Sequence, residues 1–147
     1  MKNILVENYN SFTERIGYLK DLPLLLMRLV LAYGFWGPAM MKWNNISGVS
    51  EWFGGMGIPF PTFNAYMAAG TEMAGVILLA LGLFTRIISI PLIIVMLVAI
   101  FTVHFSNGFE AGDNGFEIPL YYLIMLFTLL VKGAGHISLD NTIRKSL

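Results

Sequence analysis

The sequence predicts an all-α protein, a four-helix transmembrane bundle with both termini in the cytoplasm. Three observations support this prediction. Of the 147 residues, 56% are hydrophobic and only 12% are charged, about half the charged fraction of a soluble domain. The mean hydropathy is +0.70. The chain also contains four apolar stretches, and nearly all of its basic residues fall on one side of the layout that these stretches define.

The composition also excludes several classes of protein. Lys and Arg together number 9, as do Asp and Glu, so bulk positive charge for binding nucleic acid is absent. Cysteine is absent too, which excludes thiolate catalysis, disulfide exchange and cysteine-held metal centres. No Gly-x-Gly-x-x-Gly follows a predicted strand, so no dinucleotide fold is expected. We predict no metal site, because His104 would have only carboxylates beside it.

Residues 1–21 are predicted to form a cytoplasmic segment that precedes the membrane domain. No apolar core of signal-peptide length lies in it. Ser11 and Glu14 have the spacing of a capping box. The apolar residues recur at helical spacing and would form one stripe: Tyr9, Phe12, Ile16 and Leu19. We therefore expect a short amphipathic helix that lies on the membrane surface.

Residues 22–143 are predicted to form the membrane domain, because about 20 mainly apolar residues cross the hydrocarbon of a bilayer. The first span carries one charge, Arg28, and the second carries one, Glu72. The third carries none and ends near His104. The fourth has a short uncharged part, which Lys132 would extend by snorkelling. The predicted spans are Leu22–Met41, Thr62–Phe84, Ile87–Phe105 and Glu117–Ala134.

The connections between the spans differ in length. Trp43–Pro61 and Ser106–Phe116 are rich in turn-forming residues and are predicted to be compact outer loops. The connection at Thr85-Arg86 is so short that the second and third spans must be antiparallel neighbours.

The basic residues predict the orientation of these spans. Seven of the nine Lys and Arg residues fall on the side that carries both termini, and only Lys42 falls on the other side. Arg28 lies within the first span. Cytoplasmic loops collect basic residues, so we expect both termini in the cytoplasm. The seven residues are Lys2, Arg15, Lys20, Arg86, Lys132, Arg144 and Lys145.

Arg28 and Glu72 are the two charges expected inside the membrane. Such a charge costs about 2.5–3.5 kcal/mol on insertion scales, so it faces the bundle interior and finds a partner. Their expected depths differ by roughly 8 Å at 1.5 Å per residue, a gap that long side chains or one water could close. One interpretation is a purely structural clip between the two. The other is that Glu72 carries protons or contacts a ligand.

Further polar residues fall on the faces that we expect to point inward. Lys42 lies two heptads after Arg28, so both point the same way. His104 and Glu117 lie at a similar depth, near the outer interface. We expect a cavity that opens away from the cytoplasm, with Glu72 and Arg28 deeper inside. The candidate ligand-binding residues are Arg28, Phe35, Lys42, Glu72, Phe101, His104, Glu117 and Tyr121.

Each polar candidate also has a simpler interpretation. Lys42 could snorkel from the end of its helix. His104 could bond a loop carbonyl, and Glu117 could stabilise the start of its helix. Five ionisable residues on inward faces of one small bundle nevertheless favour a functional cavity.

Several segments stand out in the sequence: Arg28…Gly34-Phe-Trp-Gly37…Lys42, Gly55–Pro61, Glu72…Gly75, Leu81–Arg86, His104–Gly108, Asn114–Glu117 and Gly133–Asp140. Taken together in their order and spacing, they resemble the DoxX family of small four-helix membrane proteins over about Leu22 to Ile143. The resemblance implies an integral protein of the bacterial cytoplasmic membrane. It also implies a link to membrane oxidoreductase systems, among them a quinone-reducing thiosulfate oxidoreductase. His136 stands where the family often has Lys or Arg, which favours a structural role.

The leading functional hypothesis is a redox-accessory membrane protein that binds a quinone or a similar small amphipathic molecule between its helices. Lys42, His104 or Glu72 would hydrogen-bond or protonate a quinone oxygen. Two alternatives stay open: a carrier of small molecules, protons or ions, and a non-catalytic assembly partner of a membrane complex. Aromatic side chains would supply the apolar slot: Phe35, Phe101 and Tyr121.

Overall fold

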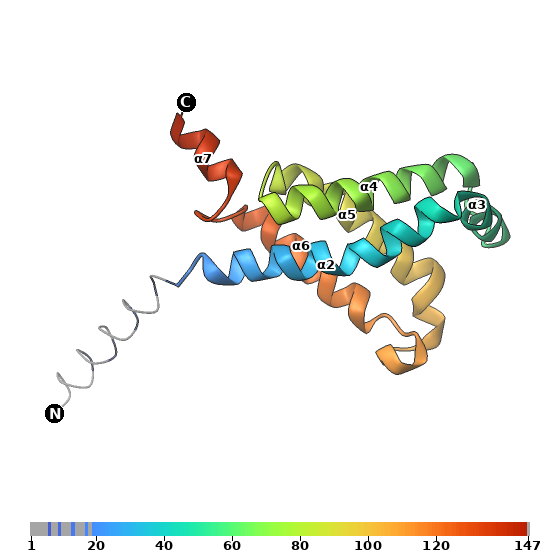
Figure 1. Cartoon of the computed structure of the whole chain (residues 1–147). Coiled ribbons are helices and arrows are strands. Elements are labelled where there is room, and N and C mark those ends of the chain that lie inside the picture. The colour runs from blue at the N-terminus through green and yellow to red at the C-terminus, as the bar shows by residue number, and fades with distance from the viewer. Residues whose placement is uncertain (1–5, 7–8, 10–12, 14–16, 18, 147) are drawn as a thin grey trace.

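The computed structural model describes residues 6, 9, 13, 17 and 19–146, and every regular element in this part of the chain is helical. The all-α prediction is therefore confirmed. The predicted amphipathic helix near the N-terminus lies largely outside the described residues. In chain order the elements are α2 (Leu22–Asn44), α3 (Ile46–Gly55), α4 (Pro61–Leu81), α5 (Thr85–Ala99), the π-helix η1 (Ile100–His104), the 3-10 turns η2 (Phe105–Asn107) and η3 (Ala111–Asp113), α6 (Glu117–Lys132) and α7 (Leu139–Ser146) (Figure 1).

Three helical stretches of the described chain are long and apolar enough to cross a membrane: Leu22–Asn44, Pro61–Leu81 and Thr85–Asn107. They coincide with the first three predicted spans. The third is composite, because α5 continues through η1 and η2. The fourth predicted span coincides with α6, whose 16 residues give a length of about 24 Å, less than the roughly 30 Å of hydrocarbon.

The four longest helices pack around a common interior. α2 contacts α4, α4 contacts α5, α5 contacts α6, and α6 contacts α2. α3 lies across one end of α4, and α7 stands at the opposite end of the molecule (Figure 1). The short turn after α4 uses left-handed backbone at Gly82 and Phe84, so α5 starts at once beside the helix that precedes it.

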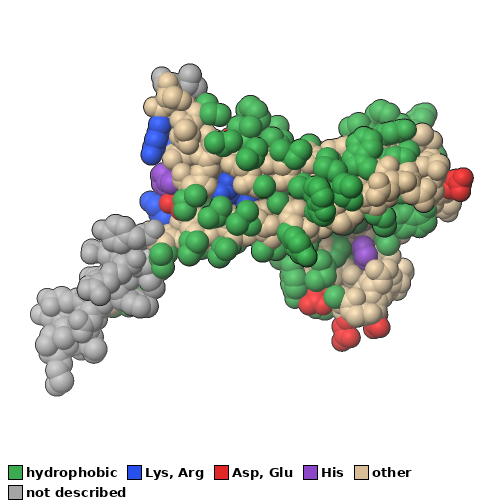
Figure 2. All heavy atoms as spheres, viewed as in Figure 1, with side chains coloured by type: hydrophobic (Ala, Val, Ile, Leu, Met, Phe, Trp, Pro, Cys, Tyr) green, Lys and Arg blue, Asp and Glu red, His purple; other side chains and the backbone are tan. Residues whose placement is uncertain are grey.

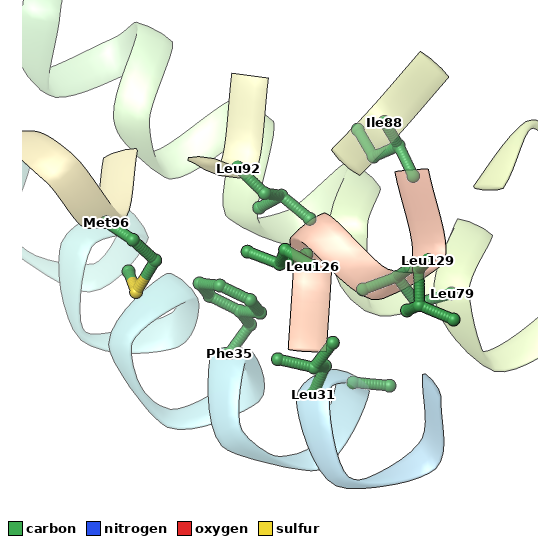
Figure 3. Packing of buried hydrophobic residues seen from close by; sticks show 9 residues of the cluster. Leu31, Phe35, Leu79, Ile88, Leu92, Met96, Leu126 and Leu129 are labelled. Atoms are coloured by element: carbon green, nitrogen blue, oxygen red, sulfur yellow. The ribbon is translucent and has the colours of Figure 1, made fainter. Parts of the chain in front are cut away.

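The interior beside the middle of α2 is filled with aliphatic and aromatic side chains. Figure 3 shows members of this cluster from four helices pointing toward one another. Large apolar side chains also cover the outside of the helices, for example Leu26, Ile90 and Phe127. This outward apolar surface is suited to lipid and not to water. The labelled cluster is Leu31, Phe35, Leu79, Ile88, Leu92, Met96, Leu126 and Leu129.

The prediction of a compact loop over Trp43–Pro61 is wrong in part, because ten of its residues form α3. The glycines in this stretch suggested turns. The Asn45 side chain instead accepts a hydrogen bond from Gly48 N at 3.1 Å and caps the helix. Val49 and Phe53, four residues apart, bury one face of α3 against Ala65 of α4. Capping and packing together override the low helix propensity of glycine.

Candidate functional site

A buried ion pair joins α2 and α4. The ammonium group of Lys42 donates hydrogen bonds to both carboxylate oxygens of Glu72, at 2.9 and 2.8 Å. Lys42 is only 9% exposed and Glu72 only 2%. Two charges taken out of water require such partners, since an uncompensated buried charge is strongly unfavourable.

The predicted pairing of Arg28 with Glu72 is wrong. The guanidinium of Arg28 packs against Gly82, which follows Glu72 by ten residues, or about 15 Å along the helix. Lys42 lies in the last turn of α2, and its ammonium group pairs with Glu72 instead. The sequence correctly indicated that Glu72 needs a basic partner, but the choice between the two bases depends on how α2 and α4 are aligned.

A cavity of about 830 Å³ lies beside the Lys42–Glu72 pair, in the half of the bundle away from α7. Both members of the pair line it, and His104 lines it as well. Most of the remaining wall is apolar, and seven elements contribute to it: α2, α3, α4, α5, η1, η3 and α6. A volume of this size falls within the range of small-molecule sites, about 300–1,000 Å³.

Irregular helical geometry accompanies this cavity. Pro38 lies inside α2 and Pro91 lies inside α5, and both line the cavity. Proline removes a helical hydrogen bond and bends the helix. The π-helix η1 continues α5 along the same wall, and π-helical turns occur frequently at functional sites. Figure 1 shows α5, η1 and α6 diverging from α2 and α4 toward the end that carries α3.

The cavity also extends to the exposed outside of the helix bundle. Several side chains line it and are at the same time exposed on the outside of the helices. These side chains are Met41, Phe63, Met67, Ile94 and Val98.

Four of the eight candidate residues line the cavity: Phe35, Lys42, Glu72 and His104. Phe35 is buried and meets Tyr122 edge to face, with ring centroids 5.5 Å apart. Tyr122, which the sequence reasoning missed, lines the cavity from α6. The Nδ1 atom of His104 also lies 2.8 Å from Asn114 O, so the loop contact that was its simpler interpretation is present as well.

Phe101, Glu117 and Tyr121 lie away from the cavity lining. Phe101 is 69% exposed on the outer surface. Tyr121 donates a hydrogen bond to Glu117 at 3.0 Å, and the other Glu117 oxygen accepts from Ala111 N at 3.0 Å. Glu117 thus ties the start of α6 to the preceding loop, in agreement with its simpler interpretation.

Arg28 belongs to the opposite end of the bundle. It is 1% exposed, and its Nη2 atom donates a hydrogen bond to Ile137 O. The chain between α6 and α7 therefore crosses over Arg28. Asp140 of α7 also ties this end of the bundle together. Its carboxylate accepts hydrogen bonds from Phe84 N and Thr85 N, at the start of α5, at 2.7 and 3.1 Å.

Asp21 and Asp140 are structural residues that sequence reasoning did not select. The Asp21 carboxylate accepts a hydrogen bond from His136 N at 2.9 Å, and His136 Nδ1 lies 2.8 Å from its other oxygen. The backbone N–H of His136, followed by its side chain, holds the pKa of Asp21 below its usual range. For Asp140 the available signal was the motif that ends in Ser-Leu-Asp, whose aspartate lies in the first turn of α7.

Comparisons with known proteins bear on this site. The family model described as DoxX matches residues 23–105. An "Uncharacterized protein" of Haemophilus influenzae is 35% identical over 130 residues, 83% of each chain. "Putative oxidoreductase CatD" of Bacillus subtilis is 30% identical over 123 residues, 82% of this chain and 87% of the relative. No solved structure matches.

Proposed function

Because the chain belongs to the DoxX family of membrane proteins, we propose that it is a redox-accessory protein of the bacterial inner membrane. It binds a quinone or a similar small amphipathic molecule in the cavity beside Lys42 and Glu72. The observation that carries this proposal is a buried ion pair on the wall of a largely apolar cavity. Such a wall combines an apolar slot with a few placed polar groups, as ligand sites do.

The hydrogen-bond donors of Lys42 support a ligand that carries a carbonyl group. A lysine ammonium group has three N–H donors, and two of them are directed at the Glu72 oxygens. The third is free to donate to a quinone oxygen in the cavity. The ring of the ligand would lie against Phe35 and Tyr122, and His104 would contact its polar edge from η1.

The chemistry that follows from this arrangement is proton handling beside a bound quinone. Reduction of a quinone takes two electrons and two protons, and Glu72 is placed to exchange a proton at that site. The described part of the chain contains no cysteine and no cluster of metal-ligating side chains that could carry the two electrons. An oxidoreductase subunit is therefore the proposed partner, and the name of the Bacillus subtilis relative supports that association.

The proposal includes a layout in the membrane. Residues 1–21 form a cytoplasmic segment, residues 22–143 form the membrane domain, and α6 is the fourth span, extended by Lys132. Both termini are cytoplasmic. The distribution of charge supports this layout: in Figure 2 the Lys and Arg side chains gather toward the end that carries α7, and most Asp and Glu side chains lie at the other end. The cavity then opens on the outer side.

A cavity-filling variant tests the proposal while leaving the ion pair intact. Ala68 lines the cavity, whereas Ala80 lies exposed on the same helix and lines no part of it. We expect a short-chain quinone to raise the melting temperature of the purified protein and of Ala80→Phe, but not that of Ala68→Phe. Quinone in a lipid extract of the protein would support the same conclusion. A protein without co-purified quinone and without a quinone-induced shift would overturn it, and proton or ion flux into liposomes would favour a carrier.

A further inference from the structure

We propose that a second site, a basic groove beside α7, binds the phosphate group of an anionic phospholipid. The groove has a volume of about 880 Å³ and lies between the start of α2, the start of α5, the end of α6 and α7. It shares no lining residue with the cavity beside Lys42 and Glu72. This inference does not depend on the proposed quinone site.

The groove collects positive charge from four separate parts of the sequence. Its basic lining residues are Lys20, Arg86, Lys132 and Arg144. Among the described residues, none of these four forms a salt bridge, since the ion pairs there are Lys42–Glu72 and His136–Asp21. The fold therefore brings together four cations and leaves their charges free to attract an anion.

The two acids that line the groove are engaged by other donors. Asp140 accepts from the backbone N–H groups of Phe84 and Thr85. Asp21 accepts from His136, and these hydrogen bonds keep the pKa of Asp21 low. Two carboxylates against four basic side chains leave a surplus of positive charge in the groove.

The exposed Arg86 side chain lies close to the backbone at Gly133. A Cβ atom placed on Gly133 would lie 3.1 Å from Arg86 Nε, and the φ angle of Gly133 is +81°. Glycine allows both the left-handed backbone and the approach of the side chain. The guanidinium therefore lies over the end of α6, where Lys132 is the last helical residue.

An apolar wall distinguishes this groove from a site for a free anion. Leu24 and Met27 of α2 and Ile87 of α5 line it, and all three belong to helices that are apolar and long enough to cross a membrane. A phospholipid fits both parts, with its phosphate among the cations and an acyl chain along the wall. A free phosphate ion would use only the charged part.

Lipid titration followed by native mass spectrometry of the full-length protein tests this site. The probes are dioleoylphosphatidylglycerol, which carries a net negative charge, and dioleoylphosphatidylcholine, which has the same phosphate but no net charge. We expect the anionic lipid to bind at least about fivefold more tightly at low salt, the factor that one basic residue contributes near an anionic surface. This comparison uses the unmodified chain and so does not depend on a variant that folds.

Two substitutions then locate the site. Lys132→Gln and Arg86→Gln are each expected to weaken binding of the anionic lipid about fivefold. Lys145→Gln is the matched control, because Lys145 is exposed on α7 and does not line the groove. This variant should bind the anionic lipid as tightly as the wild type does. Equal affinities for the two lipids, or equal effects of Lys132→Gln and Lys145→Gln, would overturn the proposal. Full displacement of the anionic lipid by millimolar inorganic phosphate would do so too, since it would indicate a free-anion site.

Discussion

Lys42 and Glu72 form a two-point ion pair, 2.8 and 2.9 Å from nitrogen to the two oxygens, that links α2 to α4 beside an 830 Å³ cavity. Both side chains are buried. The pair thus has two consequences that can be separated experimentally, one for the stability of the helix packing and one for the chemistry of the cavity.

Breaking the pair from one side should destabilise the protein. Lys42→Met or Glu72→Gln leaves a buried charge without its partner, which costs on the order of 3–5 kcal/mol. The double variant removes both charges and should recover part of that loss. Thermal unfolding of the four proteins in detergent measures this coupling. Arg28→Met with Glu72→Gln should show no such recovery, because Arg28 contacts Ile137 and Gly82 instead. A Lys42/Glu72 double variant no more stable than the sum of the two singles would argue against a coupled pair.

Gly82 should not tolerate a side chain. Its φ angle is +66°, and an added Cβ would overlap the Arg28 guanidinium. The left-handed backbone alone costs an alanine roughly 1–2 kcal/mol, and the overlap adds to it. Gly82→Ala should therefore lower the melting temperature clearly. Gly70→Ala is the control, since nothing lies within 4 Å of a Cβ there, and in the middle of α4 it should be neutral or stabilising by up to about 1 kcal/mol. Equal effects of the two variants would refute the packing of Arg28 on Gly82.

Asp21 should make stability depend on pH in the acid range. Its pKa is lower in the folded protein than its ordinary value, chiefly because of the backbone N–H of His136. The resulting stabilisation is complete above the pKa of the unfolded chain and is lost as pH falls through the lower folded-state pKa. Asp21→Asn should remove that acid-range loss, measured as melting temperature from pH 6 down to pH 2.5. Asp113→Asn, in the loop at the other end, should retain the wild-type profile; an Asp21→Asn profile that also matches the wild type would contradict this assignment.

The proposed orientation predicts on which side of the membrane two positions in the chain lie. A reporter enzyme that is active only outside the cytoplasm should be active when inserted at Gly112, between η2 and α6. The same reporter fused after Leu147 should be silent. The reverse pattern would overturn both the cytoplasmic termini and the outward opening of the cavity.

Helix positions were predictable from the sequence because hydrophobic length is a local property. The first three predicted spans and the observed stretches agree to within a few residues. The partner of Glu72 was not predictable in the same way, because it depends on the alignment of α2 against α4. Helix α3 was missed since its cap at Asn45 and its contact with Ala65 outweigh its glycines.

Side-chain direction near the cavity was harder to predict than helix position. The sequence prediction placed Phe101 inward, but this face of the third span points outward: Leu97, one helical turn earlier, is exposed as well as Phe101. On α6 a difference of one residue, about 100° around the helix, separates Tyr121 from Tyr122, which lines the cavity. In helices that are apolar on most sides, the rotation of each helix about its own axis leaves no clear signal in a single sequence.

Photolabelling with an azidoquinone tests the central claim most directly, because it reports where a quinone binds and not only whether it stabilises the protein. We expect the label on peptides from α2, α4 and η1 that line the cavity, and competition by unlabelled quinone should remove it. Ala68→Phe should abolish this labelling, whereas Ala80→Phe should leave it unchanged. Label spread evenly over the lipid-facing helix surfaces, or unaffected by Ala68→Phe, would contradict a quinone site beside Lys42 and Glu72.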